Sequence, residues 1–428
     1  MPVEIADPIT LPCGAVLKNR LAKAAMTEGI ASPENRATPA LETLYGRWAD
    51  GGAGLLLTGN VQVDRRFLER PGNVAWDGNG GLEELKAYAR AGGRNGAHIW
   101  MQINHPGRQA GTGSETFVSP SENSKPGKEG KARALEADEI ENIVDRFAGV
   151  ARAAQEAGFT GVQIHSAHGY LLSQFLSPLT NRRTDKWGGT LENRARALLE
   201  AVRRTRQAVG PEFPVSVKLN SADFQKGGLT EEESFQVISW LGEEGIDLLE
   251  VSGGNYESFV MVGRNEDGTV KQKAASTSAR EAYFLDFAAR LRPLVKMPLM
   301  VTGGFRTLAG MQDALASGAL DVIGLGRPLC IDPDYCNKLL NGAIDRLPSP
   351  DMACNLDPAQ FGNPAPEILR LMEVAAGTAY YFNQIIRLSQ GQDSEQEIDW
   401  NEQLKRIEAY DAELNQRYLK AFDAANVA

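Results

Sequence analysis

Short apolar segments alternate with amphipathic ones along most of the chain, and this alternation limits the fold more than any other feature. Eight segments are predicted to be buried strands: Leu21–Met26, Gly54–Gly59, His98–Asn104, Gly161–His165, Val215–Leu219, Asp247–Ser252, Leu299–Thr302 and Asp321–Gly324. Apolar spacings of three and four predict helices between them, most clearly at Ile140–Ala157, Leu191–Val209, Glu231–Glu244, Ala279–Leu291 and Leu308–Ser317. Such alternation is typical of a parallel sheet covered by helices, and eight units predict a (β/α)8 TIM barrel.

The main alternative is a doubly wound sheet, which is disfavoured because no GxGxxG segment follows the first predicted strand. A chain of 428 residues with 42% hydrophobic residues can bury a core that needs no disulfides. Its cysteines form no CxxC pair, so neither a zinc site nor a disulfide framework is indicated; they are Cys13, Cys330, Cys336 and Cys354. We therefore expect a reducing, cytoplasmic location.

The formal net charge of −10 and the pI of about 5.2 disfavour nucleic acid and anionic membrane surfaces as partners. No apolar stretch is long enough to span a bilayer, and the first residues do not follow the pattern of a signal peptide. We expect a small-molecule substrate and keep a homo-oligomer open as an assembly state.

Polar residues and glycines follow the predicted strands, at the end where barrels carry their active sites. In strand order they are Thr27 and Glu28, Asn60, His105–Arg108, His165–Tyr170, Asn220 and Asp223, Gly253–Gly254, Gly303–Gly304, and Gly326–Arg327. Random scatter would place about half of them at the other end, so the pattern predicts one shared site at the barrel mouth.

Glycines after the seventh and eighth predicted strands favour a phosphate site. Gly303, Gly304 and Gly326 would expose backbone N–H groups where barrels commonly bind phosphate. Arg327 could add a forked guanidinium contact. A lone Gly-Gly pair is usually only a turn, but the arrangement at two neighbouring strands favours an anion.

His165, His168 and Tyr170 form the densest chemical cluster in a chain that has four histidines. A metal would need further ligands at the mouth, and no convergent carboxylate pair accompanies His105 there. Imidazoles that donate to a carbonyl or nitro oxygen explain the pair better. Tyr170 is either a general acid or an ordinary residue of the mouth.

Lys218 lies inside an apolar strand, where burying an ammonium is costly unless it meets an anion. Two functions are open for such a lysine. It could form a Schiff base, as in an aldolase, or it could stabilise negative charge on a bound cofactor.

Three segments lie outside the repeating units. Residues 9–17 predict a hairpin that closes the barrel bottom, and residues 106–135, with little periodicity, predict a flap or small subdomain over the mouth. Helical patterns at Glu367–Leu388 and Ile398–Phe422 predict a tail that packs on the barrel or on a neighbouring subunit. We expect a barrel over residues 1–345 and a linker with a helical tail over residues 346–428.

Several segments together resemble the Old Yellow Enzyme family of FMN-dependent NAD(P)H:flavin oxidoreductases, over roughly residues 3–340. The matching segments are KNRLAKAAMT at 18–27, QINHPGR at 102–108, GVQIHSAHGYLLSQFLSPLTNRRTDKWGGTLENRAR at 161–196, Gly303–Gly304, and Asp321–Arg327. The long segment at 161–196 is too specific for a chance match. The resemblance implies a barrel that holds FMN at its mouth and takes electrons from NADH or NADPH.

The resemblance also implies roles for single residues. Ala25, Met26 and Thr27 match the segment that lines the flavin, Asn60 a backbone contact, and Gln102 the amide that pairs with the pyrimidine edge. Lys218 stands where the family usually has arginine, beside flavin N1 and O2, and Gly303, Gly304, Gly326 and Arg327 match the phosphate cradle. His165 and His168 match the pair that holds the activating oxygen of the substrate, and Tyr170 matches the proton donor.

These roles imply reduction of the activated C=C bond of an α,β-unsaturated carbonyl or nitro compound. Flavin N5 gives the hydride, and Tyr170 protonates the neighbouring carbon. Lysine in place of arginine is a departure, since a point charge cannot make the forked contact. Ala24-Ala25 in place of the more frequent Ala-Pro is another.

Three other functions compete with this one. A flavin-dependent amine dehydrogenase or demethylase would not need the carbonyl grip of the His165 and His168 pair. A Schiff-base lyase through Lys218 would need no flavin. A catalytically silent flavin-binding protein is disfavoured by the intact set of two histidines and a tyrosine.

Overall fold

The computed structural model describes residues 2–111, 117–124, 130–252 and 284–427. Eight parallel strands close into a barrel in the order β10-β11-β12-β13-β3-β4-β5-β9. Their bounds are β3 Leu21–Lys23, β4 Leu55–Gln62, β5 His98–Asn104, β9 Gly161–Ser166, β10 Val215–Asn220, β11 Leu248–Ser252, β12 Leu299–Thr302 and β13 Val322–Leu325. The predicted TIM barrel is confirmed, and each predicted strand overlaps an observed one.

The strand ends differ from the prediction at two places that matter for the site. β3 stops at Lys23, so Ala25, Met26 and Thr27 belong to the following loop. β4 instead continues to Gln62, with a shift of register against β5 between Leu57 and Asn60. Asn60 therefore lies inside a strand, beside an irregularity of its pairing.

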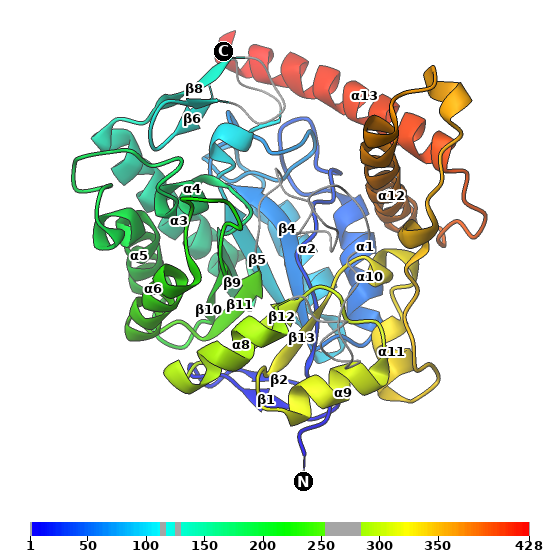
Figure 1. The fold of residues 1–428 in the computed structure, drawn as a ribbon, viewed down its shortest axis with the longest axis horizontal. Helices are drawn as coiled ribbons and strands as arrows, with labels where there is room; N and C mark the ends of the chain where they lie inside the picture. Colours follow the sequence, from blue (N-terminus) through cyan, green and yellow to red (C-terminus); the bar gives the residue numbers. More distant parts are fainter. Residues whose placement is uncertain (1, 112–116, 125–129, 253–283, 428) are drawn as a thin grey trace.

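Helices cover the outside of the barrel (Figure 1). Their bounds are α1 Pro39–Asp50, α2 Leu82–Gly92, α3 Ala137–Ala157, α4 Leu171–Leu176, α5 Leu191–Val209, α6 Glu231–Glu243, α8 Leu285–Leu291, α9 Leu308–Ala316, α10 Pro328–Ile331 and α11 Tyr335–Leu340. Local signals fix several ends: Thr230 and Glu233 form a capping box at the start of α6, and Gly158 ends α3 in the left-handed conformation. Residues 279–283 of the helix predicted at Ala279–Leu291 lie outside the described residues.

The N-terminal hairpin closes the barrel from below, as predicted. Strands β1 (Ile9–Thr10) and β2 (Val16–Leu17) pair antiparallel. Ile9 and Leu17 pack against the interior residues Leu55 and Trp100 in one buried apolar cluster. This cluster fills the lower barrel and leaves the opposite end for polar side chains.

The segment predicted as a flap contains a small sheet. Strands β6 (Val118–Ser119), β7 (Asn123–Ser124) and β8 (Lys131–Ala134) form it in the order β6-β8-β7. Residues 112–116 and 125–129 of this segment lie outside the described residues. A subdomain with its own pairing therefore stands where the sequence showed little periodicity.

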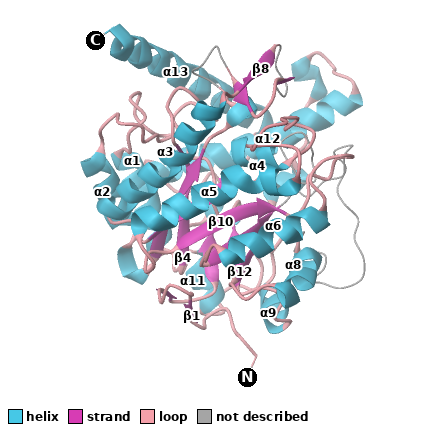
Figure 2. Ribbon diagram, turned by 90° about the vertical axis from the view of Figure 1, so that its left-hand side faces the viewer, coloured by secondary structure: helices cyan, strands magenta, loops and turns pink. Residues whose placement is uncertain are grey.

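The C-terminal tail forms two long helices, α12 (Pro366–Ser389) and α13 (Trp400–Val427), which contact each other. α12 also packs on α1 and α10. α13 crosses the end of the molecule opposite the N-terminal hairpin, in Figure 1 and again in the turned view of Figure 2. The tail thus covers part of the barrel mouth.

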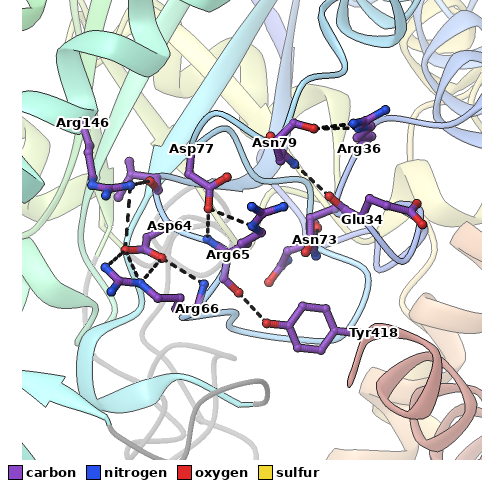
Figure 3. A network of polar contacts seen from close by, with 12 residues as sticks. Glu34, Arg36, Asp64, Arg65, Arg66, Asn73, Asp77, Asn79, Arg146 and Tyr418 are labelled. Carbon is purple, nitrogen blue, oxygen red and sulfur yellow. Dashed lines mark hydrogen bonds and ion pairs between the residues drawn. The ribbon is translucent and has the colours of Figure 1, made fainter. Parts of the chain in front are cut away.

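Side chains of the tail bind the loops that follow the first two barrel strands. Tyr418 donates to the carbonyl of Arg65 at 2.7 Å, beside the Asp64 and Arg66 ion pair in Figure 3. Tyr410 donates to the carbonyl of Gly29 at 3.2 Å. Among the described residues, no helix is long and apolar enough to cross a membrane.

Asp247 ties the hairpin to the barrel. Its Oδ1 accepts from the backbone N–H of Cys13 at 2.9 Å, and its Oδ2 accepts from Val215 N at 2.8 Å and pairs with Arg206 at 2.6 Å. We expect Asp247→Ala to lower the free energy of unfolding by about 3 kcal/mol, because it leaves the largely buried Arg206 guanidinium without its counter-ion and two N–H groups without their acceptor. Urea unfolding followed by circular dichroism measures it.

The matched control is Asp393→Ala. Asp393 also pairs with an arginine, Arg47, but its side chain is 91% exposed. It should therefore change stability by less than about 1 kcal/mol. Equal losses in the two variants would mean that Asp247 does not hold the hairpin.

Candidate active site

The predicted site residues gather at one end of the barrel. They lie in or directly after seven of its strands, and their carboxyl ends meet at the same mouth. The residues are Ala25, Met26, Thr27, Asn60, Gln102, His165, His168, Tyr170, Lys218, Gly303, Gly304, Gly326 and Arg327. The pair Gly253–Gly254, predicted after the sixth strand, lies outside the described residues.

The loop after β9 holds His168 in an uncommon backbone conformation. Its φ is 60°, in the left-handed region, which costs a residue with a Cβ roughly 1–3 kcal/mol. Two neighbours hold it: the backbone N–H of His168 donates to Asn220 Oδ1 at 3.1 Å, and Gln109 Nε2 donates to its carbonyl at 2.8 Å. This turn directs the His168 ring back toward His165.

The two imidazoles and the phenol form one compact group. His165 Nε2 and His168 Nδ1 are 3.3 Å apart and share a hydrogen bond. The Tyr170 ring packs edge-on against the His165 ring, with centroids 4.8 Å apart. The group is anchored on both sides, since His165 Nδ1 meets Asn104 Oδ1 at 3.1 Å and His168 Nε2 meets Ser252 Oγ at 2.7 Å.

Both histidines are neutral at pH 7. Burial holds the pKa of each imidazole well below its usual value, and the nearby Lys218 ammonium lowers both further. A neutral pair can donate an N–H to an oxygen without bringing a buried positive charge. Among the described residues, no group of three or more His, Cys, Asp or Glu side chains could hold a metal ion.

A buried polar layer crosses the barrel below the histidines. Gln102 donates to Gln163 at 2.7 Å, and Gln163 donates to Glu250 at 2.9 Å. Glu250 also accepts from Thr302 at 2.7 Å and forms an ion pair with Lys218 at 3.0 Å. The anion that a buried Lys218 was predicted to meet is therefore a carboxylate of the chain itself.

The residues predicted to bind phosphate include two glycines of positive φ and an arginine. Gly303 and Gly304 have φ values of 111° and 89°, which residues with a Cβ rarely adopt. Arg327 pairs with Asp351 at 2.5 Å, and Asp351 also accepts from the Tyr381 hydroxyl at 2.5 Å. Asp351, in the linker before α12, thus gives a carboxylate partner to Arg327, which was predicted to bind phosphate.

Some residues of the segment at 161–196, on which the family resemblance rests most strongly, hold loops in place. Asn181 donates from Nδ2 to the carbonyl of Phe175 in α4 and to the carbonyl of Trp187 in its own loop. Arg183 donates from NH1 to the carbonyls of Pro120 at 2.8 Å and Leu135 at 2.6 Å. These contacts fasten the small sheet of the flap to the loop that carries the histidines.

Several residues of the site were not predicted from the sequence. They are Asn104, Gln163, Glu250, Ser252, Glu69 and Asp351. Glu250 had a signal, because it stands opposite Lys218 in adjacent strands and is a second charged residue inside an apolar run. Asp351 had none, since it lies outside the repeating units.

Comparisons with known proteins agree with this geometry. The family model described as the NADH:flavin oxidoreductase / NADH oxidase family matches residues 4–345. The NADH-dependent flavin oxidoreductase iliE of Hypocrea jecorina is 36% identical over 350 residues, which is 76% of this chain and 86% of that protein. The protein of the same name from Neonectria sp. is 38% identical over 355 residues, and the match covers 77% of this chain but 46% of that longer protein.

Solved structures of flavin oxidoreductases share the fold of this chain. The old yellow enzyme homologue from Zymomonas mobilis superposes with a TM-score of 0.68 at 26% identity, covering 85% of this chain and 99% of that one. Morphinone reductase in complex with tetrahydroNAD gives 0.67 at 26% identity, covering 82% and 93%. Histamine dehydrogenase from Rhizobium gives 0.70 at 21% identity and so shares the fold.

The barrel and the matches along its sequence define the class of protein as a flavin-dependent barrel oxidoreductase. The chain belongs to the NADH:flavin oxidoreductase / NADH oxidase family. The predicted enzyme class, with FMN as its flavin and NADH or NADPH as reductant, is confirmed at the level of the family.

Three buried histidines predict acid-sensitive folding. Burial lowers the pKa of His105 to about 4, and it lowers those of His165 and His168 in the same direction. Below pH 6.5 the unfolded chain takes up protons that the folded protein does not, so the free energy of unfolding falls as the pH drops from 6.5 toward 4. His105 alone should contribute about 3 kcal/mol to this loss.

Urea titrations at several pH values measure this dependence, with His105→Asn as the comparison. Asparagine retains an acceptor for the Gly107 N–H that His105 Nδ1 now binds at 3.0 Å. The variant should lose less stability between pH 6.5 and 4 than the wild type. Parallel curves for the two proteins would contradict a buried, neutral His105.

Proposed function

We propose that the protein reduces the activated C=C bond of α,β-unsaturated carbonyl or nitro compounds, with NADH as the electron source. The observation that carries this proposal is the pair of buried, neutral, mutually hydrogen-bonded imidazoles of His165 and His168 with the Tyr170 phenol against them. The relatives named NADH-dependent flavin oxidoreductases support NADH as the reductant.

The residues at the mouth fit FMN. Gly303 and Gly304 provide a backbone without Cβ atoms, and the Arg327 side chain, 30% exposed, is reachable by a phosphate. The Gln102 amide and the Lys218 ammonium supply donors for the oxygens and nitrogens of a pyrimidine edge. When bound, FMN accepts a hydride from NADH and passes it to the substrate.

The histidine pair would hold the oxygen of the substrate. One hydrogen now joins His165 Nε2 to His168 Nδ1 at 3.3 Å, which is long for a hydrogen bond. A carbonyl or nitro oxygen that enters between the rings accepts this hydrogen in place of the other imidazole. Negative charge that develops on the oxygen is then stabilised by a donor already in position.

Tyr170 would deliver the proton. Its position at the start of α4, with its ring packed on His165, places the phenol beside the group that holds the oxygen. A phenol is neutral at pH 7 and can protonate the carbanion-like carbon next to the activating group. Protonation there completes the addition of hydrogen across the double bond.

The competing Schiff-base reaction is disfavoured by the Lys218 and Glu250 ion pair. An ammonium held by a carboxylate at 3.0 Å has no lone pair with which to attack a carbonyl. Amine oxidation is the other alternative, and the experiment below distinguishes it. The cytoplasmic location, the barrel boundary at residue 345 and a homo-oligomeric state stay predictions.

Anaerobic stopped-flow absorbance tests the proposal. Purified protein with FMN should be bleached by NADH, and cyclohexenone should then restore the yellow colour. Tyr170→Phe should keep the NADH step and slow the enone step by about 10²–10⁴-fold, because the general acid is lost. A wild-type protein that is bleached but ignores the enone would move the proposal to amine oxidation, and a protein that takes up no FMN would refute it.

A second prediction concerns Lys218. We expect Lys218→Arg to keep FMN bound but to shift its midpoint potential, since a planar fork replaces a point charge next to Glu250. Lys226→Arg, at an exposed position of the loop after β10, is the matched control and should leave the potential unchanged. Identical redox titrations of the wild type and Lys218→Arg would remove Lys218 from the flavin site.

A further inference from the structure

Glu69 stands between residues expected to touch the flavin. It lies in the loop after β4, and its Oε2 accepts from the Thr27 hydroxyl at 3.0 Å. Asn60 Nδ2 in turn donates to Thr27 Oγ1 at 3.5 Å. A short chain of hydrogen bonds from Asn60 through Thr27 therefore ends at this carboxylate.

A second chain begins at the histidine pair and ends at the same oxygen. His165 Nδ1 meets Asn104 Oδ1 at 3.1 Å, and Asn104 Nδ2 donates to Gln62 Oε1 at 3.3 Å. The chain continues from Gln62 Nε2 to Asn73 Oδ1 at 3.4 Å and from Asn73 Nδ2 to Glu69 Oε2 at 3.5 Å. Asn73 Oδ1 also accepts from the backbone N–H of Arg70 at 2.9 Å. Every member of the chain is buried or half-buried.

Glu69 has no cation of its own. Among the described residues no lysine or arginine forms an ion pair with it, and its neighbour Arg70 is held by the tail. Arg70 pairs with Asp411 at 2.7 Å and lies over the Phe382 ring at 3.9 Å. Burial raises the pKa of the Glu69 carboxyl, while Arg70 and the donors from Thr27 and Asn73 oppose that rise.

The direction of both chains follows from counting hydrogens. An ionised carboxylate only accepts, so Thr27 must give Glu69 its single hydroxyl hydrogen and can only accept elsewhere. In the second chain, Asn104 donates with its nitrogen to Gln62 and therefore presents its oxygen to His165. His165 must then carry its hydrogen on Nδ1.

The same count continues through the histidine pair. A neutral His165 with its hydrogen on Nδ1 has a bare Nε2, so the hydrogen between the rings belongs to His168 Nδ1. The bare Nε2 of His168 then accepts from the Ser252 hydroxyl at 2.7 Å. The backbone N–H of Arg70 fixes the Asn73 amide and with it every direction along this chain, and the Glu69 carboxylate is consistent with that order.

We propose that Glu69 is a positioning residue that fixes the direction of the Thr27 hydroxyl. It makes Thr27 an acceptor toward the flavin, while the backbone N–H of Arg70 orients Asn73 and so keeps the hydrogens of His165 and His168 on Nδ1. This inference rests on the proposed function for the flavin contact of Thr27, whereas the histidine assignment stands on the hydrogen bonds alone.

Nitrogen-15 NMR of the holoprotein with labelled histidine tests the histidine assignment, and four histidines make the spectrum simple. Both His165 and His168 should appear neutral with the hydrogen on Nδ1. Glu69→Gln should leave this pattern unchanged, because the backbone N–H of Arg70 still orients Asn73. A wild-type His165 with its hydrogen on Nε2, or signals of the Nε2–H form in Glu69→Gln, would overturn the assignment.

Spectroelectrochemical titration of the same proteins tests the Thr27 side. Glu69→Gln should raise the midpoint potential, because it removes a negative charge and frees the Thr27 hydrogen for the more electron-rich reduced flavin. A tenfold rise in the ratio of reduced to oxidised flavin at a fixed potential would correspond to about 30 mV. Repeating the substitution in a Thr27→Val background should give a smaller shift, since only the charge then changes.

Equal shifts in the two backgrounds, or no shift, would overturn the role of Glu69 in directing Thr27. Glu34→Gln, an exposed carboxyl in the loop after β3, is the control and should leave the spectrum and the potential unchanged. A wild-type protein that binds no FMN would overturn the proposed function and the flavin part of this inference together. Bound FMN with an unaltered potential in Glu69→Gln would overturn the inference alone.

Discussion

Glu250 is the acceptor on which the upper barrel depends. It is fully buried, and it binds Gln163 of β9, Lys218 of β10 and Thr302 of β12, while Gln163 extends the contact to Gln102 of β5. Five strands are thus fixed in register by one carboxylate, at the level directly above the apolar plug. An unpaired charge at this depth would cost several kcal/mol, so the ion pair with Lys218 is a condition for the fold as well as for the site.

Much of this arrangement could be predicted from the sequence, because it depends on local patterns. The parallel strands are continuous apolar runs, and polar residues directly after them must meet at one mouth. The same reasoning identified Lys218 as a buried cation in need of an anion. Its partner could also have been predicted, since Glu250 is a second charged residue inside an apolar strand and stands opposite Lys218 in the neighbouring strand.

The remaining parts could not be predicted because they join segments with no common pattern. Glu69, Gln62 and Asn73 belong to one irregular loop and strand end, and their order of donors depends on side-chain orientations that spacing does not encode. The tail has readable helices, but nothing in their periodicity indicates that Asp351 meets Arg327 or that Asp411 holds Arg70. The histidine pair was predicted as a donor site, whereas the backbone turn that aims His168 was not.

The contacts of the tail also bear on how the protein is made. Gly29 and Tyr410 are separated by 381 residues, and Arg70 and Asp411 by 341. A ribosome that adds about 5–20 residues per second needs roughly 20–70 s to cover such a distance. During that interval the loops after β3 and β4 are complete but lack their partners. In the nascent chain, the loops of the barrel mouth therefore stay without their α13 contacts until this last helix emerges. Chaperones have that time in which to bind the exposed loops.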